Sequence, residues 1–169
     1  MRRSSTVLAA LLALTSPACS KSDPAPVAYE DAPEFSARTF DGEDVALADL
    51  RGTVVLINVW ATWCEPCVAE LPDLADLHRQ LGERGFTVIG LNADVASKRL
   101  QVKRMVDAHD LPYSIWLDPK NQAQVAFAVR GYPTSILIDR QGKIRWRREG
   151  VILPGDPELM PILEQALAE

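Results

Sequence analysis

Residues 54–67 of this chain are Val-Val-Leu-Ile-Asn-Val-Trp-Ala-Thr-Trp-Cys-Glu-Pro-Cys. The apolar start of this segment predicts a buried strand, and apolar residues at helical spacing from the cysteines to Leu81 predict a helix. Cys64 is therefore expected at a helix N-terminus, where the macrodipole and the free backbone N–H groups favour a thiolate. Cys67 lies one helical turn further on, within reach of a disulfide with Cys64. Two cysteines with this spacing at a strand-to-helix junction predict thiol–disulfide exchange.

Other interpretations of the cysteine pair fit the sequence less well. A structural zinc site needs four ligands, and the chain offers only Cys19, His78 and His109 besides the pair. Neither histidine follows the cysteines in a haem-attachment pattern. A purely structural disulfide would close too small a loop to stabilise the fold much. No metal, flavin or nicotinamide motif is visible, so we expect no cofactor and no metal: the two sulfurs are the redox group.

The N-terminus predicts export. Two arginines precede an apolar run over residues 7–14, and Ser16 and Ala18 are the small residues expected before a cleavage site. We expect residues 1–18 to be a signal peptide, which is too short to remain as a membrane span. Cleavage there resembles a bacterial lipoprotein signal, although Ser16 stands where Leu is usual. We expect a lipid anchor on Cys19; the alternative is simple export with Cys19 free or trimmed.

Charge and composition bound the rest of the chain. Its 169 residues carry a net charge of −5, which becomes −7 without the two arginines of residues 1–18. This charge disfavours nucleic acid and an anionic membrane surface as partners. Residues 19–33 are rich in Pro, Ala, Ser and Asp and predict a tether, which leaves residues 34–169 as one folded domain. Export would place the cysteines in the periplasm or another extracytoplasmic compartment, where disulfides persist.

The remaining segments alternate between strand and helix patterns. A hairpin is expected around Asp41-Gly42, and the charged run from Arg145 to Arg148 predicts a solvated edge strand. Strands are expected over residues 53–60, 86–91, 113–117, 134–138 and 143–148, and further helices over 97–108, 122–129 and 156–168, the last with Asp156 as its N-cap. This order predicts an α/β protein with helices on both faces of one sheet.

Four local patterns add to the cysteine pair. They are the whole run from Asn58 to Cys67, Glu70 three residues later, Pro72 within the helix, and Gly131-Tyr132-Pro133-Thr134. On these patterns, residues 33–168 resemble the thioredoxin fold, and within it the TlpA/ResA-like branch of exported bacterial thiol–disulfide oxidoreductases. The resemblance implies a central mixed sheet, an N-terminal hairpin and a strand–helix insertion between residues 92 and 119. That branch includes proteins that serve cytochrome c maturation.

The resemblance also implies the roles of the residues around the sulfurs. Cys64 would be the attacking thiolate and Cys67 the resolving thiol. Pro133 matches the family's cis-proline, which packs beside the disulfide and lets the preceding residue pair with an incoming chain. The residues expected to contact a substrate are Trp63, Glu65, Pro66 and Tyr132.

Glu70 is the expected proton-transfer group. Thioredoxin itself carries a buried Asp on the strand before the motif, whereas this chain has Asn58 at the matching place, and an amide cannot relay a proton. In the ResA-like branch an acid at the position of Glu70 takes that part. Glu70 lies on the same helical face as Cys67, so we expect partial burial and a raised pKa. The alternative is a solvated surface carboxylate.

These expectations describe an exported protein-disulfide reductase whose catalytic group is Cys64, Cys67, Glu70 and Pro133. The partners that the resemblance implies are disulfide-bearing exported proteins, among them apocytochrome c. A membrane thiol-reductase would return electrons to the cysteine pair. Contact with the membrane itself would run only through the lipid anchor.

Other classes of protein remain as alternatives. A peroxiredoxin-like peroxidase needs Thr and Pro before a lone peroxidatic cysteine, whereas Ala61 stands three residues before Cys64. A copper metallochaperone would use the two thiolates plus a histidine, and nothing in the sequence places His78 or His109 near them. A non-catalytic binding module would tolerate loss of the cysteines, and both are present. The oxidoreductase is the leading hypothesis.

Overall fold

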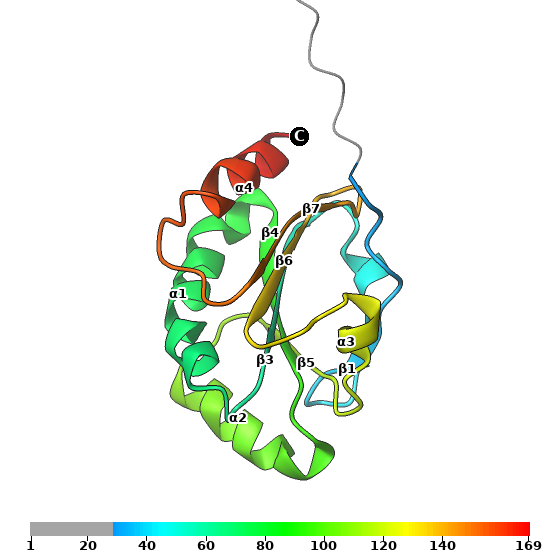
Figure 1. Cartoon of the computed structure of the whole chain (residues 1–169), viewed down its shortest axis with the longest axis vertical. Helices are drawn as coiled ribbons and strands as arrows, with labels where there is room; N and C mark the ends of the chain where they lie inside the picture. The colour runs from blue at the N-terminus through cyan, green and yellow to red at the C-terminus, as the bar shows by residue number, and fades with distance from the viewer. Residues whose placement is uncertain (1–28) are drawn as a thin grey trace, which may run out of the picture.

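The computed structural model describes residues 29–169, in which seven strands form one mixed sheet (Figure 1). The strands are β1 (Ser36–Arg38), β2 (Asp44–Ala46), β3 (Val54–Trp60), β4 (Phe86–Asn92), β5 (Ser114–Leu117), β6 (Thr134–Ile138) and β7 (Ile144–Glu149). Their order in the sheet is β2-β1-β5-β4-β3-β6-β7. The strands β3, β4 and β5 are parallel, whereas β6 runs antiparallel to β3 and β7 antiparallel to β6. The hairpin of β1 and β2 occupies the edge beyond β5.

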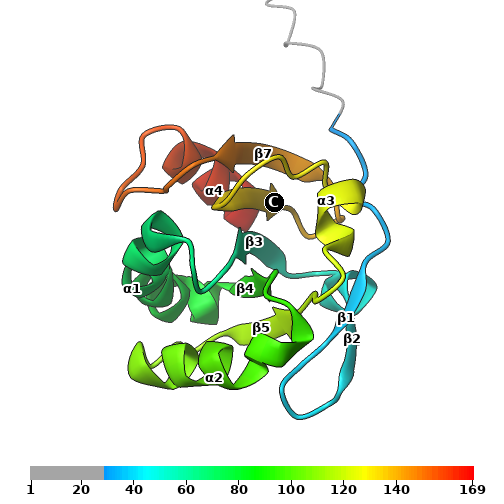
Figure 2. The same cartoon turned by 60° about the horizontal axis from the view of Figure 1, so that its bottom comes forward.

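Helices cover both faces of this sheet, as Figures 1 and 2 show. One face carries α1 (Glu65–Leu81), α2 (Arg99–Ala108) and α4 (Leu159–Ala168), and the other carries α3 (Gln122–Ala126) and the short 3-10 turn η1 (Leu47–Leu50). The expected α/β architecture with an N-terminal hairpin is therefore confirmed. The helix α2 and the strand β5 are the elements expected between residues 92 and 119.

The strand β3 is central to the sheet and buried along its whole length. Leu56 and Trp60 belong to the core cluster under α1 and α4, whereas Ile57 and Val59 belong to the cluster on the α3 face. This alternation follows from the two-residue period of a strand. Because both faces of β3 are packed, its carboxyl end has a fixed position, and the cysteine motif begins there. We call this edge of the sheet the motif end.

Two helices begin later than expected. The helix α2 begins at Arg99 because residues 96–98 form the 3-10 turn η3 (Ala96–Lys98). The helix α4 begins at Leu159 instead of at Asp156. The Asp156 carboxylate accepts hydrogen bonds from the N–H groups of Glu158 and Leu159, each at 3.0 Å, and so supports the turn that leads into the helix. The helix α3 is shorter than expected.

The end of the expected tether, residues 19–33, packs against the domain where the structure describes it. The Glu30 carbonyl accepts a hydrogen bond of 2.8 Å from the Ile144 N–H. Asp31 forms an ion pair of 2.7 Å with Lys143. These contacts attach the chain to the β6–β7 turn before the first strand of the sheet begins.

Arg145 corrects the expectation of a solvated edge strand. Its side chain is only 3% exposed and forms ion pairs with Asp139 and Glu169. Its guanidinium also lies 4.2 Å from the centre of the Tyr29 ring. The prediction was wrong at this position because the partners of Arg145 lie outside β7, Asp139 before the β6–β7 turn and Glu169 after α4, and alternation along β7 does not reveal them.

The expected signal peptide, residues 1–18, and the expected lipid attachment site, Cys19, lie outside the described residues. Within residues 29–169, no helix is both long enough and apolar enough to cross a membrane.

Candidate functional site

Cys64 and Cys67 form a disulfide at the motif end of the sheet. The S–S distance is 2.08 Å and the two Cα atoms are 5.3 Å apart. Cys64 is the N-cap of α1, and its Sγ accepts a hydrogen bond of 3.3 Å from the Cys67 N–H. A sulfur at this position faces backbone donors and the positive end of the helix dipole. The local geometry thus favours a thiolate on Cys64 after reduction.

The residues on either side of the sulfurs form an exposed rim. Trp63 is 68% exposed, and Glu65 and Pro66, which follow Cys64, are exposed as well. The Trp63 ring meets the Tyr132 ring edge-to-face, with 5.7 Å between the ring centres. Trp63 is thus a large exposed apolar side chain next to a buried disulfide. Exposed aromatic groups of this kind commonly mark contact sites.

The Tyr132–Pro133 peptide bond is cis, as expected. Thr134, the next residue, is paired with Val59 near the carboxyl end of β3. This register places the Tyr132–Pro133 segment beside the loop that leads into the cysteine motif. The expected substrate-contact residues therefore come together from two segments that are far apart in the sequence.

Glu70 is buried, with 1% of its surface exposed, so the alternative of a solvated carboxylate is wrong. Its carboxylate accepts a hydrogen bond of 2.7 Å from the Asn58 side-chain amide and one of 2.9 Å from the Ile152 N–H. The same amide donates to Ser135 Oγ at 3.0 Å. Burial raises the pKa of Glu70 to about 7, although the two hydrogen bonds to the carboxylate act in the opposite direction. The group can therefore change protonation near neutral pH.

A second acid near the motif, Asp94, was not predicted from the sequence. The Asp94 carboxylate, which follows β4, accepts a hydrogen bond of 2.7 Å from the backbone N–H of Thr62. Asp94 stands 32 positions from Thr62 in the sequence. No local motif signals the contact; the parallel pairing of β3 with β4 brings the two residues together.

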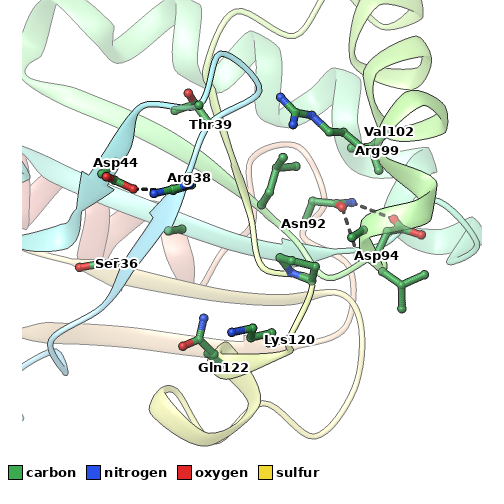
Figure 3. Close-up of a pocket in the computed structure, with 16 residues that line it drawn as sticks. Ser36, Arg38, Thr39, Asp44, Asn92, Asp94, Arg99, Val102, Lys120 and Gln122 are labelled. Atoms are coloured by element: carbon green, nitrogen blue, oxygen red, sulfur yellow. Dashed lines mark hydrogen bonds and ion pairs between the residues drawn. The ribbon is translucent and has the colours of Figure 1, made fainter.

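A cavity of about 630 Å³ borders Asp94 (Figure 3). Its walls come from the β1–β2 hairpin, the end of β4 with the loop that follows it, the start of α2, and the turn between β5 and α3. The charged and polar side chains around it include Arg38, Asp44, Asn92, Arg99 and Lys120. Because four separate segments build this cavity, periodicity along the sequence could not predict it.

Within the described residues, no group of three or more His, Cys, Asp and Glu side chains is arranged to hold a metal ion.

Comparison with known proteins places the chain in a family. Residues 28–147 match the AhpC/TSA family. The chain belongs to the AhpC/TSA family. Among its curated relatives, the thioredoxin-like protein YneN of Bacillus subtilis is 36% identical over 117 residues, which cover 69% of this chain and 68% of YneN. The thiol-disulfide oxidoreductase ResA of Bacillus cereus is 35% identical over 115 residues, or 68% of this chain. The match spans 65% of the length of that ResA.

Solved structures agree with this placement. A thiol:disulfide interchange protein of the thioredoxin family from Chlorobium tepidum has a TM-score of 0.72 and 30% sequence identity, covering 85% of this chain and 99% of that protein. The exposed lipoprotein thioredoxin Etrx1 of Streptococcus pneumoniae has a TM-score of 0.66 and 25% identity, covering 78% and 98%. The thioredoxin fold and the resemblance to ResA-like proteins are therefore confirmed.

Proposed function

We propose that this chain is an exported thiol–disulfide oxidoreductase that reduces disulfides in partner proteins. The observation that carries the proposal is the Cys64–Cys67 disulfide at the N-terminus of α1, bordered by the exposed Trp63. Relatives named thiol-disulfide oxidoreductase and thiol:disulfide interchange protein support the same activity.

The reaction begins with the reduced dithiol. The Cys64 thiolate attacks one sulfur of the partner disulfide, and the other partner sulfur leaves as a thiolate and takes up a proton. The Cys67 thiolate then attacks Cys64 Sγ and breaks the mixed disulfide. The products are the Cys64–Cys67 disulfide and a partner with two thiols, so two electrons pass to the partner. In the first attack, the Cys67 N–H, which contacts Cys64 Sγ, stabilises the Cys64 thiolate.

Glu70 supplies the proton exchange that the second step needs. Cys67 must lose its proton before it attacks Cys64, and Glu70 follows Cys67 by three residues on the same helical face. With a pKa of about 7, Glu70 is present in both protonation states near neutral pH. It can therefore take a proton from the thiol and later release it.

The rim receives the partner chain. The backbone N–H and C=O groups of Tyr132 form no backbone hydrogen bond with other residues of the described range 29–169. An extended segment of the partner would pair with these groups beside Pro133, as in other cases of strand addition. Trp63 and Tyr132 would bury apolar side chains of that segment next to the disulfide.

Export and a lipid on Cys19 would place this site on the outer side of a membrane. The β6–β7 turn, to which the chain is attached before β1, lies opposite the motif end, because β6 runs antiparallel to β3 and pairs Ile138 with Val55. An anchored domain would thus present the start of α1, and with it the disulfide, away from the lipid surface. The partners would be exported disulfide-bearing proteins, including apocytochrome c, with a membrane thiol-reductase as electron donor.

Trapping tests this function. Cys67→Ala should leave Cys64 joined to partner proteins, because the resolving thiol is missing, and Cys64→Ala should trap none. Mass spectrometry of trapped complexes from cells that export the protein identifies the partners. Equal recovery from both variants would contradict the proposal.

The alternative functions predict other results. If the protein were a peroxidase, its reduced form would consume hydrogen peroxide; if it were a copper chaperone, it would bind Cu(I) through the same two thiols.

A further inference from the structure

Asp94 closes a hydrogen-bond network around the loop that precedes the cysteine motif. Its Oδ2 accepts from the Thr62 N–H at 2.7 Å and from the Asn92 amide at 2.9 Å, and its Oδ1 accepts from the Thr62 hydroxyl at 2.9 Å. The Asp94 N–H donates in return to Asn92 Oδ1 at 3.2 Å. Asp94 is only 6% exposed. Figure 3 shows the Asn92 and Asp94 side chains joined in the wall of the cavity.

This network holds both ends of a short turn. The Trp60 carbonyl accepts a hydrogen bond of 2.9 Å from the Ala93 N–H, which ties the end of β3 to the residue before Asp94. Four residues after Trp60, the Cys64 N–H closes the turn onto the Ala61 carbonyl at 3.1 Å. Thr62 lies between these two bonds. A carboxylate that accepts several donors forms stronger hydrogen bonds than a neutral acceptor, so Asp94 is the main attachment of the turn.

We propose that Asp94 is a positioning residue for Cys64. By holding Thr62 through two bonds, it keeps the turn in the conformation that makes Cys64 the N-cap of α1. In that position the Cys67 N–H and the helix N-terminus stabilise the Cys64 thiolate. The inference rests on the proposed function for its purpose, but it concerns a property of the thiol that is measured without any partner.

Two substitutions of Asp94 separate the effect of its hydrogen bonds on Cys64 from the effect of its charge. In an Asp94→Asn variant, the amide oxygen can accept from the Thr62 N–H and from Asn92, and the amide nitrogen can donate to the Thr62 hydroxyl. This variant therefore keeps the network and loses the charge. Asp94→Ala loses both. The other acids along the motif and α1 are unchanged in both variants; they are Glu65, Glu70, Asp73 and Asp76.

The test measures the pH dependence of Cys64 alkylation in reduced protein whose folded state is checked by circular dichroism. Asp94→Ala should raise the Cys64 pKa by about one unit, so that alkylation at neutral pH slows by up to about tenfold. Asp94→Asn should stay close to wild type. Asp118→Ala is the matched control, because Asp118 is also a buried acid that accepts two backbone N–H groups, at the start of α3. It should lower stability and leave the Cys64 pKa unchanged.

Two results would overturn the proposal. An unchanged Cys64 pKa in folded Asp94→Ala would mean that Asp94 only stabilises the fold. A fall in the Cys64 pKa in both variants would mean that the charge of Asp94, not the position of the turn, matters, because loss of a nearby negative charge lowers a thiol pKa. If Asp94→Ala does not fold, Thr62→Val removes one of the two Thr62 bonds and should give a smaller rise, and no rise would again overturn it. A confirmed pKa shift in a protein that reduces no partner would refute the proposed function alone.

Discussion

The single residue Glu70 owes its chemical role to burial, which raises the pKa of its carboxyl group. Its carboxylate has two hydrogen-bond donors, Asn58 and Ile152, and each of them favours the ionised form. Desolvation is the larger effect, and the pKa rises to about 7. A carboxyl group with this pKa suits proton exchange with a thiol, because neither protonation state is strongly favoured near neutral pH.

The raised pKa of Glu70 predicts a pH-dependent cost of folding. Its pKa lies near 7 in the folded protein and near 4.5 in the unfolded chain, so the stability linked to its protonated form is complete below pH 4.5 and is lost as the pH rises towards 7. Urea unfolding of the oxidised protein, in which no thiol of the pair titrates, should show this loss as roughly 3 kcal/mol. Glu70→Gln should lack it. Parallel stability curves for the two proteins would contradict the assignment.

Glu70 should also control the second thiol in the reduced protein. An ionised Glu70 beside the Cys67 thiolate would raise the pKa of Cys67 by like-charge repulsion. Glu70→Gln keeps the volume of the side chain but removes its charge. The pKa of Cys67 should therefore fall, and disulfide exchange should slow or change its pH profile. Thiol titration and exchange kinetics measure the two effects. Unchanged values in both would leave Glu70 without a part in the reaction.

At the scale of elements, the N-terminus of α1 and the loop before Pro133 meet through Trp63 and Tyr132. Trp63→Ala should cost less than about 1.5 kcal/mol of stability, because the side chain is exposed and its main loss is one aromatic contact. Reduction of a protein disulfide should slow by about five- to tenfold, whereas reduction of a small aromatic disulfide should be unaffected. Val125→Ala, at an even more exposed apolar position on α3, is the control. Equal slowing with both substrates would argue against a docking role.

The ion pairs of Arg145 join α4 to the sheet, since Glu169 follows α4 and Arg145 belongs to β7. Arg145→Met leaves Asp139 buried without its charged partner and should lower the free energy of unfolding by about 2–3 kcal/mol. The Cys64 alkylation rate should not change, because these residues lie opposite the motif end. Denaturant unfolding and alkylation of the same sample test both statements. A large change in alkylation would show that the two ends of the sheet are coupled.

The elements also show what sequence alone can predict. The strand β3, the helix α1 and the hairpin were predictable because period and turn residues are local signals. The start of α4 was not, because the turn at Asp156 competes with the helix for the same backbone N–H groups. The contact of Arg145 with Glu169 and that of Thr62 with Asp94 were also beyond prediction. Packing of α4 against the sheet sets the first, and pairing of β3 with β4 sets the second.

At the scale of the whole molecule, attachment and chemistry occupy opposite ends of the sheet. The first described residues and the end of α4 meet at the β6–β7 turn, where Tyr29 and Glu169 both contact Arg145. The start of α1 lies towards the other end, next to the carboxyl end of β3 (Figure 1). The cysteine pair, Glu70 and the rim belong to this region. This division leaves the rim around the disulfide free of these contacts, while the first described residues and the end of α4 are held at the opposite end of the sheet.

The stoichiometry of one exchange reaction shows most directly whether the cysteine pair reduces disulfides. Reduced protein is mixed with an excess of a disulfide-bonded peptide, and both products are quantified by mass spectrometry after acid quenching. Each protein molecule should reduce one peptide disulfide and should itself acquire the Cys64–Cys67 disulfide, while Cys64→Ala should reduce none. Peptide that stays oxidised beside protein that keeps both thiols free would show that the cysteine pair is not a disulfide reductant.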